Sequence, residues 1–376
     1  MREMRASGVD VISFATGEPD FDTPAGICAV GKRSIDEGLT RYTPSAGLLD
    51  LRKAIVEKLQ RENDLTYDEN EIIVTCGAKL AIYDALQVIV NEGDEVIIPA
   101  PYWVSYPEQV KLADGIPIIV STTANTSFKV TPQMLEEHIT DKTKAIILNY
   151  PCNPTGSTYT REELSKLGEY LVEKGIAIIS DEIYEKLVFG DVVHTSIVAA
   201  CPEVRSHTIL INGVSKGYAM TGWRMGYAAG PRDIISKMTA FVGQQIYGIP
   251  AFVQKACIEA LTNSGEDVAM MMGEFETRCK SMVEVLSTIP GLEFCIPDGT
   301  FYIFPNVSSY FGKKFKERTI DNSTDLAEYL LKEARVATMS GDAFGGPGHL
   351  RLSYVISKEG IEEGIRRLKR ALEKLK

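Results

Sequence analysis

One lysine in a glycine-containing loop is the residue of this sequence best suited to covalent chemistry. Lys216 lies in the stretch NGVSKGYAMTGWR (Asn212–Arg224), with Ser215 before it, Gly217 after it and Arg224 eight residues later. Most loop lysines are simply solvated, but an amine withdrawn from water loses its proton more easily and can form a Schiff base with a carbonyl group. The planar guanidinium of Arg224 suits a phosphate, which it can bind through two parallel hydrogen bonds.

The elements around this loop follow an alternating pattern. Between about residues 70 and 230, short Ile- and Val-rich runs alternate with helical periods, and the helix expected at Thr160–Lys174 opens with a T-x-E-E start. This alternation predicts an α/β fold with a mainly parallel sheet covered by helices on both faces. Strands are expected at Glu71–Thr75, Glu95–Pro99, Ile116–Ser121, Lys144–Asn149, Ile176–Ser180, His207–Ile211 and Met225–Ala229.

Polar stretches follow several of these strands directly. Asn149 leads into YPCNPTG, Ser180 leads into Asp181, and Lys216 comes shortly after the strand that ends at Ile211. In parallel sheets, ligands bind at the carboxyl ends of the strands. We therefore expect Asn153, Asp181 and Lys216 to line one site.

The last hundred residues predict a smaller α+β domain, completed by the N-terminal segment. Its expected helices and strands are Glu266–Leu286, Thr324–Arg335, Lys358–Lys376, Thr300–Phe304 and His349–Ser353. The expected division is a large domain at residues 20–275 and a small domain made of residues 1–19 and 276–376.

The composition excludes several classes of protein. The formal net charge of −11 disfavours nucleic acid or an anionic membrane as the main partner. Seven scattered cysteines without a C-x-x-C pair, and four histidines without ligand spacing, predict reduced thiols and no metal site. No G-x-G-x-x-G follows a strand, which disfavours a nicotinamide dehydrogenase. A charged N-terminus and the lack of a long apolar run predict a soluble, cytoplasmic protein with no membrane partner.

Eight motifs in order resemble the class I aminotransferases of the aspartate aminotransferase type, which are fold type I enzymes dependent on pyridoxal 5′-phosphate. The resemblance implies their three-layer αβα fold and covers the chain from Gly17 nearly to its end. The motifs are GEPDFDTP (Gly17–Pro24), RYTPSAG (Arg41–Gly47), GAKLA (Gly77–Ala81), PYWVSYPE (Pro101–Glu108), NPTG (Asn153–Gly156), SDEIYE (Ser180–Glu185), SKGYAMTGWRMGY (Ser215–Tyr227) and RLSY (Arg351–Tyr354).

The resemblance implies a role for each cofactor-binding residue. Lys216 matches the catalytic Schiff-base lysine, which also shuttles the substrate proton. Asp181 matches the acid that keeps the pyridine nitrogen protonated, so that the ring can accept electrons. The remaining matches are Tyr184 and Asn153 at the phenolic oxygen, Trp103 stacked on the ring, and Ala78, Lys79, Ser215, Arg224 and Tyr42 around the phosphate. Tyr42 is expected to come from a neighbouring subunit, which implies a homodimer with shared sites.

The resemblance also implies how a substrate is held. Arg351 matches the arginine that binds the α-carboxylate, with the backbone at Gly17 closing over it and with Trp103 and Asn153 beside it. Without the resemblance, we would interpret Arg351 as a member of a surface ion pair. Lys79 matches a lysine that helps to bind a distal carboxylate in one bacterial branch of the family. It is otherwise a solvated helix-start lysine, although cations are disfavoured at helix N-termini.

Three features depart from the family pattern. Only sixteen residues precede Gly17, so an N-terminal arm over the partner's site is expected to be short or missing. The segment Gly243–Pro250 replaces a more polar loop, and its Tyr247 could favour aromatic or mixed substrates. Cys152 stands where Asn is usual, beside the retained Asn153.

The leading hypothesis for function is transfer of an amino group from an L-amino acid, with aspartate as the first choice, to a 2-oxo acid by a ping-pong mechanism. The same fold and cofactor residues also support a carbon–sulfur β-lyase of the cystathionine β-lyase type, or an aromatic amino acid aminotransferase. A non-catalytic protein of this fold is the least favoured alternative, because Lys216, Asp181, Tyr184, Arg224 and Arg351 are all retained.

Overall fold

The computed structural model describes residue 4 and residues 6–376. In this part of the chain, seven strands form the main sheet, in the order β2-β8-β7-β6-β5-β3-β4. These strands are β2 (Ile72–Thr75), β3 (Glu95–Ala100), β4 (Ile116–Ser121), β5 (Thr143–Asn149), β6 (Ala177–Asp181), β7 (Thr208–Gly213) and β8 (Gly226–Ala229). Neighbouring strands from β7 to β4 are parallel, whereas β8 runs antiparallel to both β7 and β2. The prediction of a mainly parallel sheet is confirmed.

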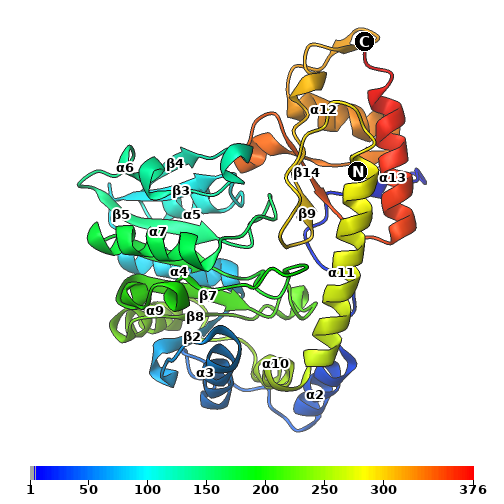
Figure 1. Ribbon diagram of the computed structural model, residues 1–376. Helices are drawn as coiled ribbons and strands as arrows, with labels where there is room; N and C mark the ends of the chain where they lie inside the picture. Colours follow the sequence, from blue (N-terminus) through cyan, green and yellow to red (C-terminus); the bar gives the residue numbers. More distant parts are fainter. Residues whose placement is uncertain (1–3, 5) are drawn as a thin grey trace.

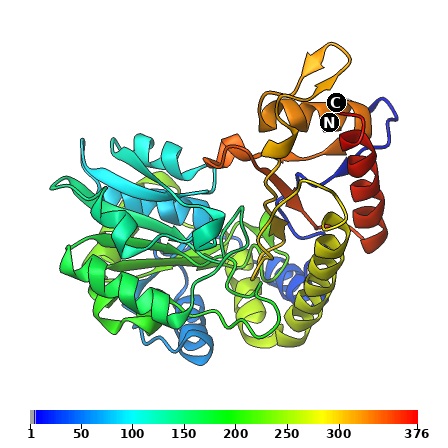
Figure 2. The same cartoon turned by 45° about the horizontal axis from the view of Figure 1, so that its top comes forward.

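Helices cover both faces of this sheet, as Figures 1 and 2 show. They are α2 (Ala25–Asp36), α3 (Leu49–Asn63), α4 (Ala78–Ile89), α5 (Tyr106–Leu112), α6 (Pro132–Glu136), α7 (Arg161–Glu173), α8 (Ile197–Ala200), α9 (Arg232–Gln245) and α10 (Ala251–Asn263). The predicted start of α7 is confirmed: the Thr160 hydroxyl accepts a hydrogen bond from the Glu163 amide, and the Glu163 carboxylate accepts one from the Thr160 amide.

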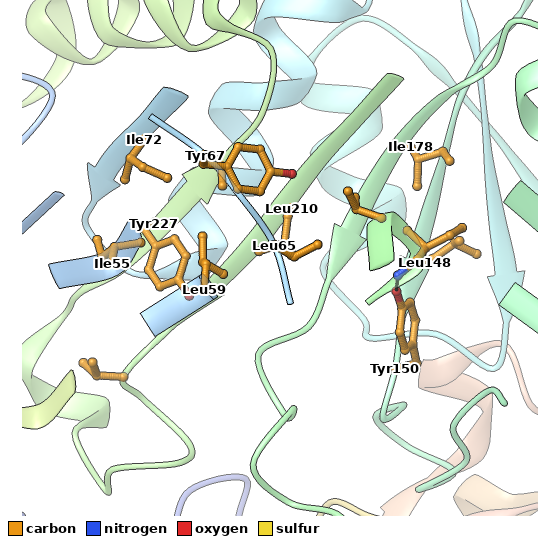
Figure 3. Packing of buried hydrophobic residues seen from close by; sticks show 14 of the residues in the cluster. Ile55, Leu59, Leu65, Tyr67, Ile72, Leu148, Tyr150, Ile178, Leu210 and Tyr227 are labelled. Carbon is orange, nitrogen blue, oxygen red and sulfur yellow. Dashed lines mark hydrogen bonds between the residues drawn. The ribbon is translucent and has the colours of Figure 1, made fainter. Parts of the chain in front are cut away.

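Alternate residues of the strands other than the edge strand β4 pack into two separate apolar clusters. Ile178 belongs to the cluster that includes residues of α3, α7 and α10, whereas its neighbour Ile179 belongs to the cluster beneath α4, α5 and α9. Figure 3 shows part of the first cluster, where Ile55 and Leu59 of α3 lie near Ile72 and Tyr227. Side chains of a strand point alternately to opposite faces, so a sheet buried on both faces requires the uninterrupted Ile/Val runs of this sequence.

The remaining elements surround a third apolar cluster. They are α11 (Gly265–Leu286), α12 (Ser323–Tyr329), α13 (Lys358–Leu372), a π-helical turn at Leu330–Ala334, and the strands β1 (Ile12–Ser13), β9 (Tyr302–Ile303), β10 (Lys314–Phe315), β11 (Arg318–Thr319), β12 (Val336–Ala337), β13 (Met339–Ser340) and β14 (Leu350–Ser353). The strands β13, β14 and β9 form an antiparallel sheet, and β1 pairs with β12.

The N-terminal segment packs with the C-terminal elements, since Phe14 is buried in the same cluster as Ile361 and Ile365 of α13. Helix α11 is continuous across residues 275 and 276 and extends from beside α10 and α2 to α13 (Figure 1). The predicted division into domains at this position stays a prediction. Among the described residues, no helix is long and apolar enough to cross a membrane.

Candidate active site

The sheet topology brings the predicted site residues to one edge. Because β2, β5, β6 and β7 run in the same direction, their carboxyl ends lie together, and Asn149 at the end of β5 pairs with Asp181 at the end of β6. Arg224 reaches this edge differently, because it precedes β8, which runs in the opposite direction. A cavity of about 390 Å³ opens there. Its lining includes Gly17, Ala78, Lys79, Trp103, Asn153, Asp181, Tyr184, Ser215, Lys216, Arg224 and Arg351.

Lys216 lies largely buried in this cavity. Its Nζ donates a hydrogen bond of 2.6 Å to the carbonyl oxygen of Gly17. Burial lowers the pKa of Lys216 to about 8, a change that the nearby charge of Arg351 supports and that of Glu18 opposes. A substantial fraction of this amine is therefore unprotonated in mildly alkaline solution, as a nucleophile or general base requires.

Asp181 is a buried carboxylate held in one orientation. Its Oδ2 accepts a 2.6 Å hydrogen bond from the Tyr106 hydroxyl, and its Oδ1 accepts a 3.2 Å hydrogen bond from the Ile183 amide. Burial raises the pKa of Asp181 to about 6, while the hydrogen bond from Tyr106 acts in the opposite direction. Asp181 thus remains mainly ionised at neutral pH and can pair with a cation inside the cavity.

The start of α4 and the side chain of Arg224 form an anion site. Gly77, the N-cap of α4, has φ of +83°, and a Cβ there would lie 2.5 Å from Nη2 of Arg224. The guanidinium donates to the carbonyl oxygen of Thr221 at 2.9 Å and to that of Cys76 at 3.4 Å. Free amide groups, the helix dipole and a fixed guanidinium all favour an anion at this position.

Arg351 on β14 provides a second, deeper cation. Its Nη1 donates to Oδ1 of Asn153 at 3.0 Å and its Nη2 donates to the carbonyl oxygen of Ala15, also at 3.0 Å. The side chain is 6% exposed, and no carboxylate in the described part of the chain pairs with it. The interpretation of Arg351 as part of a surface ion pair is therefore wrong. A buried guanidinium without a counter-ion is suited to bind a carboxylate ligand.

Lys79 lies within the first turn of α4, which follows β2 at the same edge of the sheet. Its Nζ lies 4.7 Å from the ring centroid of Trp103. The Trp103 ring in turn meets Tyr106 edge-on, with 5.4 Å between ring centroids. Lys79 is an exposed residue whose Nζ lies over the Trp103 ring at the cavity wall.

Comparisons with known proteins agree over almost the whole chain. The model for "Aminotransferase class I and II" matches residues 9–368. This chain belongs to the class I and II aminotransferases. Like the other members of that family, it is an enzyme that depends on pyridoxal phosphate and transfers amino groups between amino acids and 2-oxo acids.

Individual relatives agree with this family. The aspartate aminotransferase of Bacillus sp. YM-2 is 48% identical over 98% of this chain and 93% of its own length. The probable aspartate/prephenate aminotransferase of Aquifex aeolicus is 45% identical over 100% of this chain and 94% of its own. The crystal structure of the Rhizobium meliloti aspartate aminotransferase has a TM-score of 0.97 at 36% identity, covering 100% of this chain and 94% of that one. These relatives support transamination over the carbon–sulfur lyase alternative.

Tyr42 is the predicted site residue that the structure does not bring to the cavity. Its side chain is 90% exposed, and its ring lies 5.2 Å from that of Tyr247, measured between centroids. Tyr247 is also exposed and does not line the cavity of this chain. In this aminotransferase the two rings therefore form an exposed aromatic pair. Because Tyr42 lies outside the cavity of its own chain, a contact between Tyr42 and an active site requires a second copy of the chain.

The sequence reasoning missed several cavity residues, among them two tyrosines that contact predicted site residues. Tyr106 binds Asp181, and Tyr302 contacts both Tyr184 and Arg351. Tyr106 lies within a quoted motif, three residues after Trp103, and this spacing at a helix start was the available signal. Tyr302 lies in a predicted strand, but its proximity to Arg351 depends on the pairing of β9 with β14, which a single sequence does not specify.

Proposed function

We propose that this aminotransferase uses L-aspartate as amino donor and a 2-oxo acid such as 2-oxoglutarate as acceptor. The observation that carries the proposal is the presence of two cations, Arg351 and Lys79, in one cavity and on different elements. Aspartate, glutamate and their 2-oxo acids each carry two carboxylates. The names of the relatives from Bacillus and Aquifex also include aspartate.

The residues at the sheet edge fit pyridoxal phosphate. Because Gly77 has no Cβ, the Arg224 guanidinium lies close to the start of α4, where it, the amides that begin at Ala78 and the hydroxyl of Ser215 suit the phosphate. Asp181, buried and mainly ionised, suits a protonated pyridine nitrogen. When bound, the cofactor supplies an electron-accepting ring that stabilises negative charge at the substrate Cα.

Tyr184 and Asn153 would hold the phenolic oxygen of the cofactor, and Trp103 would cover one face of its ring. Tyr184 is buried, and burial raises the pKa of its hydroxyl well above the usual range, so it is a hydrogen-bond donor at all working pH values. Its proton can therefore be donated without being lost.

Lys216 would have two tasks in this proposal: it would hold the cofactor between turnovers and, when free, would move a proton at the substrate Cα. Its lowered pKa, about 8, matches both tasks because the amine can accept and return a proton near neutral pH. The carbonyl oxygen of Gly17 orients the amine.

Arg351 would bind the substrate α-carboxylate through its two terminal nitrogens, assisted by the Asn153 side chain. Lys79 would bind the distal carboxylate. With both ends of a dicarboxylate fixed, the substrate Cα is positioned beside Lys216, which lowers the entropic part of the barrier.

The test is a comparison of amino donors in the Lys79→Ala variant. We expect the KM for aspartate to rise about tenfold or more, since one charge-assisted contact is lost, while the KM for a monocarboxylic donor such as phenylalanine stays unchanged. Lys111→Ala, at an exposed lysine paired with Glu108 on α5, is the matched control. Unchanged aspartate kinetics in Lys79→Ala would contradict this assignment of the side-chain pocket.

A larger substrate is a second candidate, favoured by the apolar part of the cavity wall. Ile82, Val104, Met339 and Phe344 line the cavity beside the two cations. Apolar lining of this kind can accept a cyclic or aromatic side chain. The Aquifex relative is named for prephenate as well as aspartate, and a 40% identical structure from Pyrococcus horikoshii, with a TM-score of 0.92 and 99% coverage of both chains, is named an aromatic aminotransferase. Assays with prephenate and phenylpyruvate as acceptors test this candidate.

We also propose a homodimer in which Tyr42 reaches the phosphate site of the partner. The proposal is supported by the exposure of Tyr42, away from the cavity of its own chain. Mixing inactive Lys216→Ala with weakly active Tyr42→Phe chains tests it. A shared site predicts hybrid dimers in which one site carries both substitutions and the other carries neither. Recovery of activity on mixing supports the proposal, and a monomeric protein in sedimentation contradicts it.

A further inference from the structure

Tyr302 is a buried tyrosine that contacts two proposed site residues at once. Its hydroxyl oxygen lies 3.1 Å from that of Tyr184. The guanidinium carbon of Arg351 lies 4.4 Å from the centroid of its ring. The ring is therefore between the residue proposed for the cofactor's phenolic oxygen and the residue proposed for the substrate α-carboxylate.

The register of the small sheet explains this position. Tyr302 on β9 pairs with Ser353 on β14, so Arg351, two residues before Ser353, lies on the same face as Tyr302 and diagonal to it. Diagonal neighbours on an antiparallel pair are close enough for long side chains to touch. The contact between Tyr302 and Arg351 is thus fixed by backbone pairing.

An unusual backbone conformation also holds Tyr302 in place. Thr300, two residues earlier, has a φ of +64° and is fully buried. Its hydroxyl oxygen accepts a 3.1 Å hydrogen bond from the Tyr302 amide, and its carbonyl oxygen accepts a 3.2 Å hydrogen bond from the Tyr354 hydroxyl. Positive φ at a β-branched residue is strained and persists only where the surroundings enforce it.

The segment that carries Tyr302 is attached to the loops of the main sheet. The Gly299 amide donates to the carbonyl oxygen of Gly156 at 2.9 Å, and the Thr300 amide donates to that of Leu187 at 2.9 Å. Gly156 has a φ of +74°, and a Cβ there would lie 2.8 Å from the carbonyl oxygen of Gly299. The backbone of Tyr302 is therefore fixed relative to both the NPTG loop and the loop of Tyr184.

We infer that Tyr302 is a positioning residue that couples the substrate-carboxylate site at Arg351 to the hydroxyl of Tyr184. This inference rests on the roles proposed above for Tyr184 and Arg351. Each phenol has one proton, so when Tyr184 donates its proton to the cofactor, Tyr302 must donate to the oxygen of Tyr184. A hydrogen bond received by Tyr184 strengthens the one that it donates.

Arg351 acts on the same hydrogen bond. Its positive charge opposes the effect of burial on the pKa of Tyr302 and so makes the Tyr302 hydroxyl a better donor. A substrate carboxylate that neutralises Arg351 weakens this donation and, through it, the hold of Tyr184 on the phenolic oxygen. Through Tyr302, the binding of a carboxylate at Arg351 thus affects the cofactor site. Some residues of the cofactor site come from a different part of the fold.

The test separates the hydroxyl of Tyr302 from its ring. Tyr302→Phe removes the hydrogen bond and keeps the cation–π contact, whereas Tyr302→Leu removes both. The first readout is the pH midpoint of the visible absorbance of the bound cofactor, and the second is the Kd of succinate, a dicarboxylate that cannot react. Tyr329→Phe is the matched control, because Tyr329 is equally buried and donates to the carbonyl oxygen of Ala371, remote from the cavity.

We expect Tyr302→Phe to raise the midpoint by a few tenths of a pH unit, since a weaker Tyr184 donor stabilises the deprotonated phenolic oxygen less. Tyr184→Phe should raise it further, and Tyr302→Phe should then add nothing in the Tyr184→Phe background. Succinate should bind Tyr302→Phe somewhat more tightly than the unaltered enzyme, because its binding no longer weakens a hydrogen bond to Tyr184, and should bind Tyr302→Leu roughly threefold or more weakly.

The outcomes distinguish the inference from the function on which it rests. If the pH midpoint moves in Tyr184→Phe but not in Tyr302→Phe, the inference is overturned and the proposed function is not. The same holds if the midpoint shifts of the two single variants add up in the double variant. A midpoint that does not move in Tyr184→Phe overturns the proposed role of Tyr184 and the inference with it. If Tyr302→Leu does not fold, the Tyr302→Phe cycle still decides the question.

Discussion

The hydroxyl of Tyr106 donates a 2.6 Å hydrogen bond to Oδ2 of Asp181, and both groups are buried. This bond stabilises the ionised form of Asp181 against the effect of burial, which raises the pKa of the carboxyl group to about 6. Tyr106 begins α5 and Asp181 ends β6, so the contact joins two elements that are distant in sequence.

Tyr106→Phe is therefore expected to raise the pKa of Asp181 further. Because the proposed partner of Asp181 is a protonated ring nitrogen, a neutral carboxyl group binds it less well. In the unaltered protein, the affinity of the apoprotein for pyridoxal phosphate should fall as the pH decreases through about 6. In Tyr106→Phe this fall should begin at a higher pH.

Titrations of the apoprotein with cofactor between pH 5 and 8, followed by absorbance, check this expectation. Tyr310→Phe is the control, since its hydroxyl bonds the carbonyl oxygen of Pro290 at 2.5 Å, remote from the cavity. Identical pH profiles in Tyr106→Phe and the unaltered protein would contradict the proposed role of the hydrogen bond.

Gly77→Ala should damage the anion site, whereas Gly93→Ala should not. Both glycines have a positive φ, +83° and +86°, so alanine strains the backbone at each position. Only at position 77 does the new Cβ meet Arg224, at 2.5 Å from Nη2, whereas nothing lies within 4 Å at position 93. The displaced guanidinium should lower the affinity for pyridoxal phosphate about tenfold or more.

Equilibrium titration of both variants with pyridoxal phosphate, alongside thermal unfolding, separates the two effects. A loss of stability in both variants, with a loss of cofactor affinity in Gly77→Ala alone, is expected. Equal affinity in the two variants would mean that Arg224 does not hold the phosphate.

The strands were predictable because a sheet that is buried on both faces requires apolar runs in the sequence. The predicted bounds are wrong where a side-chain hydrogen bond or the backbone conformation of one residue overrides this apolar pattern. Glu71 was predicted within the first strand, but it belongs to a 3₁₀ turn in which its side chain caps the Asp68 amide. The strand predicted at Thr300–Phe304 is reduced to Tyr302–Ile303, since Thr300 has a left-handed backbone. Such conformations depend on tertiary contacts that a propensity argument does not contain.

The residues of the active site also fall into two groups: those whose position was predictable from the sequence and those whose position was not. Lys216 follows a strand and Asp181 ends one, so their place at the carboxyl edge was predictable from the order of the elements. The burial of Arg351 was not, because it depends on Ala15 and Asn153, which are distant in sequence. Arg351 was identified as a site residue through the resemblance to a known family, whereas Tyr302 was identified only from the structure.

Lys216→Met should stabilise the apoprotein at neutral pH. The folded-state pKa of about 8 lies below the usual 10.5, so the charged amine destabilises the fold below pH 8. This penalty is on the order of 3 kcal/mol and disappears as the pH rises from 8 towards 10.5. Urea unfolding of apoprotein should show a gain at pH 7 that is largely lost at pH 10.5. Lys237→Met, at an exposed position of α9, should show no such gain.

Asp84→Asn should stabilise the protein in alkaline solution without altering cofactor binding. Asp84 is fully buried on α4 outside the cavity lining, and burial raises the pKa of its carboxyl group to about 7, only partly offset by the Gln245 side chain. The folded-state pKa of Asp84 lies above the usual 3.8, so ionisation of this carboxyl group destabilises the folded protein. The loss of stability develops as the pH rises from 3.8 to 7 and is complete above pH 7, where it reaches roughly 4 kcal/mol. Unfolding in urea should therefore show Asp84→Asn gaining stability at pH 8 and little at pH 4, whereas Asp141→Asn, at an exposed position, gains at neither. A gain of equal size at both pH values would show that the buried charge is not its source.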